Sequence, residues 1–303
     1  MPKDILDIYT DYLICQNQQA TAIGLANLLD SELSHDQITR FLNKNEYSSK
    51  DLWKYVKADV RKHEQKTGGV LIIDDAIEEK PYTDENEIVS WHFSHAKGRC
   101  VKGINILSGL IRYGDLALPI GYEVIKKDLH FCDIKTKKEQ RQSSMTKNQH
   151  LRALVAQAIE NGVLFDYVLA DNWFDAKDNM EFIHYDLKKF FVFGIKANRL
   201  IALSEEDRKK GRYQNLNTLD FKGGQKRVVW LKDLAFPVAL ITKIFKNEDG
   251  SAGVLHIVTN DLDSDADRIY EVYQKRWRIE EYHKSIKQNT SLEKLILTHK
   301  SKI

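Results

Sequence analysis

The sequence has few of the residues that interrupt regular secondary structure or build covalent frameworks. It holds only four prolines and fifteen glycines in 303 residues, which favours long helices and strands. Its three cysteines, Cys15, Cys100 and Cys132, are an odd number without metal-binding spacing. We therefore expect free thiols of a reducing compartment, and neither a disulfide framework nor a zinc site.

Long apolar runs are missing as well. No stretch approaches the ~18 uninterrupted apolar residues of a membrane span. The first residues, Met1 to Asp4, do not show the basic and then apolar pattern of a signal peptide. These absences predict a soluble, cytoplasmic protein that is not attached to a membrane.

A strong net charge is also lacking, because the formal net charge of +2 is too small to indicate a nucleic-acid binder. The distribution of charge is more informative. Residues 268–303 hold nine Lys/Arg against four Asp/Glu, and residues 121–152 hold eight against four. Residues 1–66 hold nine against ten. Each basic run is either a solvated helix face or part of a binding surface for an anionic partner. In the second case, the partner would contact the middle and the end of the chain.

The N-terminal 66 residues have a helical pattern. Two short apolar-periodic segments cover residues 20–29 and 34–42, with Ser34 as the expected N-cap of the second. Such a pair resembles a DNA-binding helix-turn-helix, although any small helical bundle gives the same pattern. We predict a helical N-terminal domain over residues 1–66, ended by Thr67-Gly68-Gly69.

The remainder, residues 67–303, alternates between short apolar runs and helical periodicity. The predicted strands cover residues 70–75, 101–111, 116–125, 167–171, 190–195 and 254–259, and the predicted helices cover 146–161, 176–187 and 263–289. Residues 197–252 are polar and lysine-rich with β-like pieces, and we interpret them as an insertion. This order predicts an α/β fold with a mixed sheet and flanking helices.

Two of these predicted strands end in acids, at Asp75 and Asp171. One aspartate at such a position can simply cap the next turn. Two that lie side by side near a core repel each other unless a cation neutralises them. Mg²⁺ and Mn²⁺, which prefer oxygen ligands, suit that arrangement.

The last predicted helix carries a polar stripe beside an apolar one. Its polar members step by three or four residues and therefore share a face: Tyr273, Arg276, Glu280, Lys284 and Lys287. By itself this pattern is also typical of an exposed helix face with ion pairs.

The spacing Tyr273-x2-Arg276-x3-Glu280-x6-Lys287, after two strand-end aspartates, resembles the signature of bacterial cut-and-paste insertion-sequence transposases with a DDE catalytic core. Residues 74–81 and 169–174 are similar to the blocks that carry the first and second aspartates of that family. The three blocks occur in the family's order, and the resemblance covers roughly residues 70–290.

The resemblance implies a ribonuclease-H-like fold with a β-rich insertion, here at about residues 197–252. It implies that Asp75, Asp171 and Glu280 are the catalytic residues and hold two Mg²⁺ or Mn²⁺ ions. Asp74 is the rival for the first position; we prefer Asp75 because the family's ligand usually precedes a small residue, here Ala76.

The resemblance also implies contacts with DNA. Tyr273, Arg276 and Lys287 match the family's contacts to phosphates around the cut end. We expect Lys284, on the same face, to join them. Trp277 is expected either to stack on a displaced base or to pack in the core.

The function that follows is a DNA transposase that cleaves element ends with a metal ion and transfers the strand to target DNA. Its expected partners are double-stranded DNA, as terminal inverted repeats and target, and a second copy of the chain. Two alternatives stay open: a nuclease of the same fold that cuts without joining, and a non-catalytic DNA-binding relic. Family members commonly continue past the lysine with further helices, so we expect a C-terminally truncated copy.

Overall fold

The computed structural model describes residues 4–16, 20–44, 46–94, 97–135, 137–219, 223–246, 250 and 252–290. Its α-helices are α1 (Ile5–Cys15), α2 (Ala22–Leu28), α3 (His35–Lys44), α4 (Ser49–His63), α5 (Lys147–Glu160), α6 (Lys177–Glu181), α7 (Glu205–Lys209), α8 (Ala266–Gln274) and α9 (Trp277–Asn289). A π-helical turn covers Phe182–Asp186 and a 3-10 turn covers Leu216–Thr218. No described helix is long and apolar enough to cross a membrane.

Strands make up the centre of the molecule. They are β1 (Val70–Glu79), β2 (Ser90–Ser94), β3 (Arg99–Tyr113), β4 (Leu116–Val124), β5 (Leu129–Asp133), β6 (Lys138–Gln142), β7 (Tyr167–Ala170), β8 (Phe190–Gly194), β9 (Leu200–Ala202), β10 (Gln214–Asn215), β11 (Lys226–Leu231), β12 (Val238–Lys246) and β13 (Ala252–Thr259). The main sheet runs in the order β10-β9-β11-β12-β13-β8-β7-β1-β3-β2, with β4 also paired to β3. β7 pairs in parallel with β1 and β8, and the other pairs are antiparallel.

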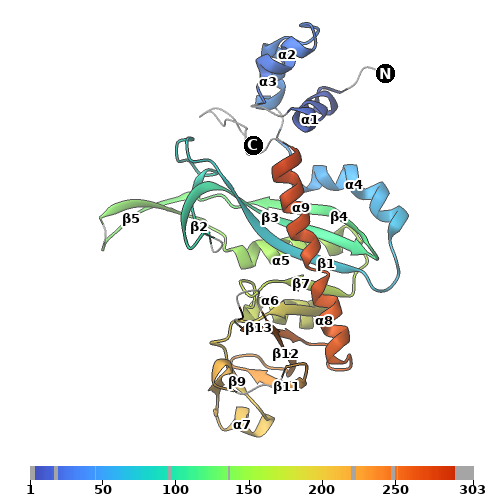
Figure 1. Cartoon of the computed structure of the whole chain (residues 1–303). Coiled ribbons are helices and arrows are strands. Elements are labelled where there is room, and N and C mark those ends of the chain that lie inside the picture. The colour runs from blue at the N-terminus through green and yellow to red at the C-terminus, as the bar shows by residue number, and fades with distance from the viewer. Residues whose placement is uncertain are drawn as a thin grey trace.

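The predicted α/β fold with a mixed sheet and flanking helices is confirmed, and it is consistent with the ribonuclease-H-like fold that the resemblance implies. Figure 1 shows the sheet crossed by α8 and α9, with helices α1 to α3 beyond one end of α9. The strands within residues 197–252 extend the main sheet through β12, while β5 and β6 form a separate hairpin.

Strand β1 separates the two halves of the core. Leu71 and Ile73 pack with side chains of α4 and α5 on one face. Val70 and Ile72 pack with side chains of α8 and α9 on the other. Because side chains alternate along a strand, the next residues, Asp74 and Asp75, also point to opposite faces.

Two predicted elements that carry candidate site residues differ from the structure. β1 continues to Glu79, because its antiparallel pairing with β3 extends as far as Gly103, so both aspartates lie within the strand and not at its end. The helix predicted over residues 263–289 is broken between α8 and α9. There the amides of Arg276 and Ile279 bond to carbonyls three residues back, at 2.9 and 3.1 Å. This tighter turn places Arg276 at the junction.

The N-terminal helices form two groups. Helices α1 to α3 share a small buried cluster: Tyr12, Ala20, Leu25, Ala26 and Ile38. The predicted cap of α3 is present, because the amide of Gln37 donates to Ser34 Oγ at 3.2 Å. Helix α4, in contrast, contributes Trp53 and Val60 to the core of the main sheet.

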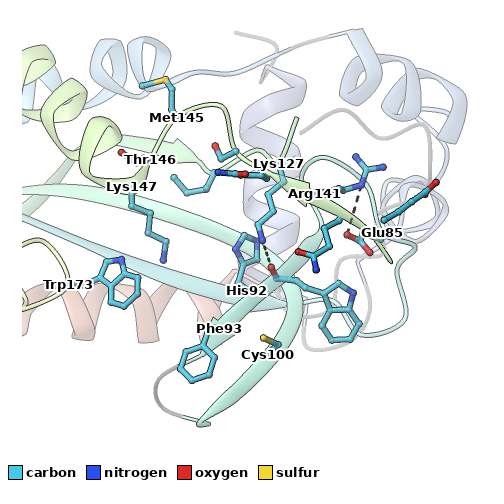
Figure 2. Close-up of a pocket in the computed structure, with 16 residues that line it drawn as sticks. Glu85, His92, Phe93, Cys100, Lys127, Arg141, Met145, Thr146, Lys147 and Trp173 are labelled. Carbon is cyan, nitrogen blue, oxygen red and sulfur yellow. Dashed lines mark hydrogen bonds and ion pairs between the residues drawn. The ribbon is translucent and has the colours of Figure 1, made fainter. Parts of the chain in front are cut away.

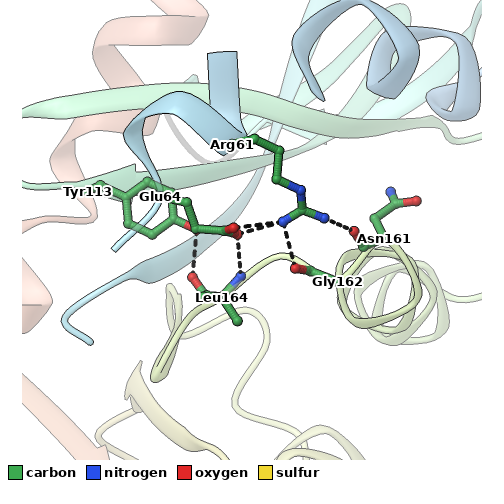
Figure 3. A network of polar contacts seen from close by, with 6 residues as sticks. All are labelled: Arg61, Glu64, Tyr113, Asn161, Gly162 and Leu164. Carbon is green, nitrogen blue, oxygen red and sulfur yellow. Dashed lines mark hydrogen bonds and ion pairs between the residues drawn. The ribbon is translucent and has the colours of Figure 1, made fainter. Parts of the chain in front are cut away.

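A polar network fixes the end of α4 against the loop after α5 (Figure 3). Glu64 Oε1 accepts hydrogen bonds from Arg61 Nη1 at 2.8 Å, from the amide of Leu164 at 2.9 Å and from the Tyr113 hydroxyl at 3.3 Å. Arg61 Nη1 also donates to the carbonyl of Gly162 at 2.8 Å. Residues about 100 positions apart in sequence are thereby joined, and α4 is held on the sheet.

Candidate active site

Two acidic residues meet where β1 and β7 run side by side. The parallel register pairs Leu71 with Val168 and Ile72 with Leu169. Continued by two residues, it sets Asp171, directly after β7, opposite Asp74. The end of a parallel strand beside its neighbour is where polar site residues are expected in open sheets.

The carboxylates of Asp74 and Asp171 disfavour each other's charge. Burial and then the nearby Asp171 raise the pKa of Asp74 from its ordinary 3.8 to about 7, although Arg276 opposes this shift. Burial also raises the pKa of Asp171, while a hydrogen bond from the amide of Trp173, at 2.9 Å, lowers it. Asp75 adds further repulsion to both. The site therefore concentrates negative charge that needs a cation.

Arg276 supplies one cation from the junction of α8 and α9. Its Nη1 lies 3.1 Å from Asp74 Oδ2, and its Nη2 lies 2.7 Å from Glu280 Oε1. The pair with Asp74 is shielded from water, because 15% of the Arg276 side chain and 14% of the Asp74 side chain are exposed, whereas 38% of the Glu280 side chain is exposed. The sequence prediction placed Arg276 and Glu280 in one site, and the structure brings them together with Asp74.

Asp75 makes a different set of contacts. Its Oδ2 accepts a hydrogen bond from Asn105 Nδ2 at 2.9 Å and lies 2.7 Å from Lys147 Nζ, at the start of α5. Neither partner was predicted from the sequence. Lys147 lies in the basic run of residues 121–152, and Asn105 is a polar residue within an apolar strand, so both carried a recognisable signal.

Tyr273 reaches the same region from α8, and 8% of it is exposed. Gly194, the last residue of β8, leaves room for it. A Cβ at position 194 would lie 2.9 Å from the Tyr273 hydroxyl and 3.0 Å from the amide nitrogen of Asn172. The glycine thus permits the tyrosine to pack against the segment that follows Asp171.

The other residues predicted to bind DNA lie along α9. Trp277 is 62% exposed and Lys284 is exposed. Lys287 turns to β1, where its Nζ donates to the carbonyl of Ile77 at 2.8 Å and lies 4.0 Å from Glu78 Oε2. Contact of these three residues with DNA stays a prediction.

The chemistry of the donors fits a hard divalent cation. Asp74 and Asp171 offer carboxylate oxygens, the ligands that Mg²⁺ and Mn²⁺ prefer, and their mutual repulsion is what such an ion relieves. Within the described ranges, however, no three His, Cys, Asp or Glu side chains converge in a metal-binding group. Glu280 is instead engaged by Arg276.

Two family models match the chain. Residues 2–214 match a family model described as a DDE superfamily endonuclease, and residues 136–300 match one described as a transposase DDE domain. No curated protein matches the chain. Each model covers more than half of the sequence, and the second includes both Asp171 and Glu280. The chain therefore belongs to the DDE superfamily of transposases and endonucleases.

Proposed function

We propose that this protein is a DNA transposase that cleaves the ends of its element with a divalent cation and joins them to target DNA. The observation that carries the proposal is the meeting of Asp74, Asp171 and the Arg276–Glu280 pair from three elements far apart in sequence. Membership of the DDE superfamily supports nuclease-type chemistry on DNA.

The metal ligands proposed from sequence are Asp75, Asp171 and Glu280, with Asp74 as the rival first ligand. The contacts favour Asp74, because it adjoins Asp171 and shares Arg276 with Glu280. The carboxylate of Asp75 already pairs with Lys147 and accepts a hydrogen bond from Asn105. We therefore assign the first ligand position to Asp74 and a supporting role to Asp75.

DDE transposases generally use divalent metal ions. Held by Asp74 and Asp171, such a metal centre would supply an activated water and would stabilise the leaving oxygen of a displacement at phosphorus. The chain's own cations act on the substrate: Arg276 and Lys147 lie beside the carboxylates, where they would offset phosphate charge and orient the strand. Tyr273, packed next to Arg276, holds that arginine in place.

The proposed partners are double-stranded terminal repeats, target DNA and a second copy of the chain. Helices α2 and α3 are the candidate reader of the repeat, because they form a short capped pair outside the main core. A nuclease that does not join strands and a DNA-binding relic are the alternatives that an assay must separate.

The test is incubation of a plasmid carrying the element's terminal repeats with protein and Mg²⁺ or Mn²⁺. Wild type is compared with Glu280→Gln and with Glu281→Gln, a matched control whose exposed carboxylate pairs with Arg278. We expect cleavage at the repeat ends by wild type and Glu281→Gln, and none by Glu280→Gln. Cleavage without joining would identify a nuclease. Specific binding without cleavage would identify a relic.

A further inference from the structure

The carboxylate of Glu280, a metal ligand in the sequence prediction, is bound by an arginine in the structure. Arg276 Nη2 lies 2.7 Å from Glu280 Oε1, while Nη1 lies 3.1 Å from Asp74 Oδ2. The two outer nitrogens of the guanidinium are thus both committed to carboxylates. A divalent cation placed on Glu280 Oε1 would stand next to the positive guanidinium, which repels it. Arg276 therefore competes with a metal ion for this oxygen.

The local structure favours this pairing. Arg276 directly precedes α9 and Glu280 lies in the first turn of that helix, and side chains four residues apart share a face. Tyr273, three residues before the arginine, is buried, and the centre of its ring lies 5.7 Å from Arg276 Cζ. The guanidinium is therefore held by an aromatic ring as well as by two carboxylates.

The second cation at the site serves a different carboxylate. Lys147 Nζ lies 2.7 Å from Asp75, on the face of β1 opposite to Arg276. Figure 2 shows Lys147 among the residues that line a pocket on that side, near Trp173. A change of partner by Arg276 therefore leaves the pair of Lys147 and Asp75 in place.

A DNA phosphate is a strong competitor for Arg276. A phosphodiester offers two oxygens that match the planar guanidinium, so the pair can form two parallel hydrogen bonds. The two carboxylates differ in how firmly they hold the arginine, because 38% of the Glu280 side chain is exposed but 14% of the Asp74 side chain. Exposed ion pairs are the weaker ones. The bond to Glu280 is therefore the one that a phosphate would replace.

We propose that Arg276 withholds Glu280 from the divalent cation until a DNA phosphate binds the guanidinium. Asp74 and Asp171 then hold the cation in the absence of DNA, and Glu280 joins them when DNA is bound. By thermodynamic linkage, DNA and the cation strengthen each other's binding. The proposal rests on the proposed function, because it takes DNA as the substrate and Glu280 as a metal ligand.

Without DNA, removal of the Glu280 carboxylate should hardly affect the cation. The dissociation constant of Mn²⁺ is measured at pH 8 from the electron paramagnetic resonance signal of the free ion. We expect Glu280→Gln to change it by less than about twofold, whereas Asp171→Asn weakens binding at least about tenfold. Arg276→Met frees Glu280, so adding Glu280→Gln to that variant should weaken binding roughly 5- to 150-fold.

Arg278→Met is the matched control, because it removes a neighbouring arginine that is 41% exposed and pairs with Glu281. In that background Glu280→Gln should again leave the affinity for Mn²⁺ unchanged. Circular dichroism shows whether Arg276→Met folds. If it does not, the comparison with DNA decides the question, because it keeps the native arginine.

DNA should make the same substitution visible in protein that retains Arg276. The probe is a duplex that carries the terminal repeat, already cut at its end and closed by a 3′-dideoxynucleotide, so that it can be neither cleaved nor joined. We expect this duplex to raise the affinity of wild type for Mn²⁺ roughly 5- to 150-fold. The gain should be much smaller in Glu280→Gln.

Two results would overturn the proposal. One is a loss of Mn²⁺ affinity in Glu280→Gln without DNA that is as large as the loss in Asp171→Asn. The other is an equal gain from the duplex in wild type and in Glu280→Gln. Repeat cleavage that still depends on Glu280 would then leave the proposed function standing. If wild type binds no Mn²⁺ with or without the duplex, the proposed function fails and this proposal fails with it.

Discussion

The guanidinium of Arg276 lies 3.1 Å from the carboxylate of Asp74, which precedes it by 202 residues. The same guanidinium binds Glu280, so one cation joins β1 to the start of α9. Only 14% of the Asp74 side chain is exposed. An ionised carboxylate at such a buried position destabilises the fold unless a cation pairs with it.

Replacement of Arg276 should therefore destabilise the metal-free protein. At pH 8, where Asp74 is ionised, Arg276→Ala leaves Asp74 and Glu280 without their shared cation, and we expect the free energy of unfolding to fall by about 3–5 kcal/mol. Arg278→Ala is the control, because its pairing with Glu281 is largely exposed and worth under about 1 kcal/mol. Urea denaturation measures both. Equal effects of the two substitutions would contradict a structural role for Arg276.

The pKa of Asp74 predicts a pH dependence. Because it is raised from 3.8 to about 7, the folded state keeps a proton that the unfolded state loses within that window. The contribution of Asp74 to stability is thus complete below pH 3.8 and is lost as the pH rises through about 7. Relative to Asp74→Asn, wild type should lose stability across this range in thermal melts with EDTA. A difference that stays constant with pH would contradict the raised pKa.

A divalent cation should reverse that trend. The ion competes with the proton on Asp74, so the gain in Tm from Mn²⁺ should be larger at pH 8 than at pH 6. Asp74→Asn should show little gain at either pH. A gain in wild type that is independent of pH would mean that the ion binds elsewhere.

Gly194 should tolerate no side chain. A Cβ there would stand 2.9 Å from the Tyr273 hydroxyl, so Gly194→Ala is expected to cost about 1–3 kcal/mol and to reduce DNA cleavage. Adding Tyr273→Phe removes the atom nearest to the Cβ and should restore part of the stability. Gly109→Ala in β3 is the control, because its Cβ would meet the nearest atom at an ordinary 3.7 Å. Similar losses for the two alanine substitutions would refute the packing argument.

The sequence predicted the elements that its apolar periodicity marks clearly. The helix at residues 147–160 and the strand before Asp171 lie where expected. The extension of β1 could not be predicted, because it depends on pairing with β3. The break at Arg276 was also missed, since residues 263–289 hold neither proline nor glycine to mark the tight turn that the structure shows there.

The site was predictable to a similar degree. Motif spacing brought Asp171, Arg276 and Glu280 into one hypothesis, but it could not decide which of Asp74 and Asp75 faces α9. Side chains alternate along β1, but which of the two aspartates faces α9 follows only when it is known which β1 side chains pack against α8 and α9. Residues 291–303, which follow the last described helix and bear on the expected C-terminal truncation, lie outside the described residues.

Metal binding by carboxylate variants shows whether Asp74 and Asp171 hold the cation. Isothermal titration calorimetry with Mn²⁺ at pH 8 would compare wild type, Asp74→Asn, Asp171→Asn and Asp75→Asn. We expect binding by wild type, an affinity at least about tenfold lower for the Asp74 and Asp171 variants, and a smaller change for Asp75→Asn. Loss of binding in Asp75→Asn with wild-type affinity in Asp74→Asn, or no binding by wild type, would contradict this assignment.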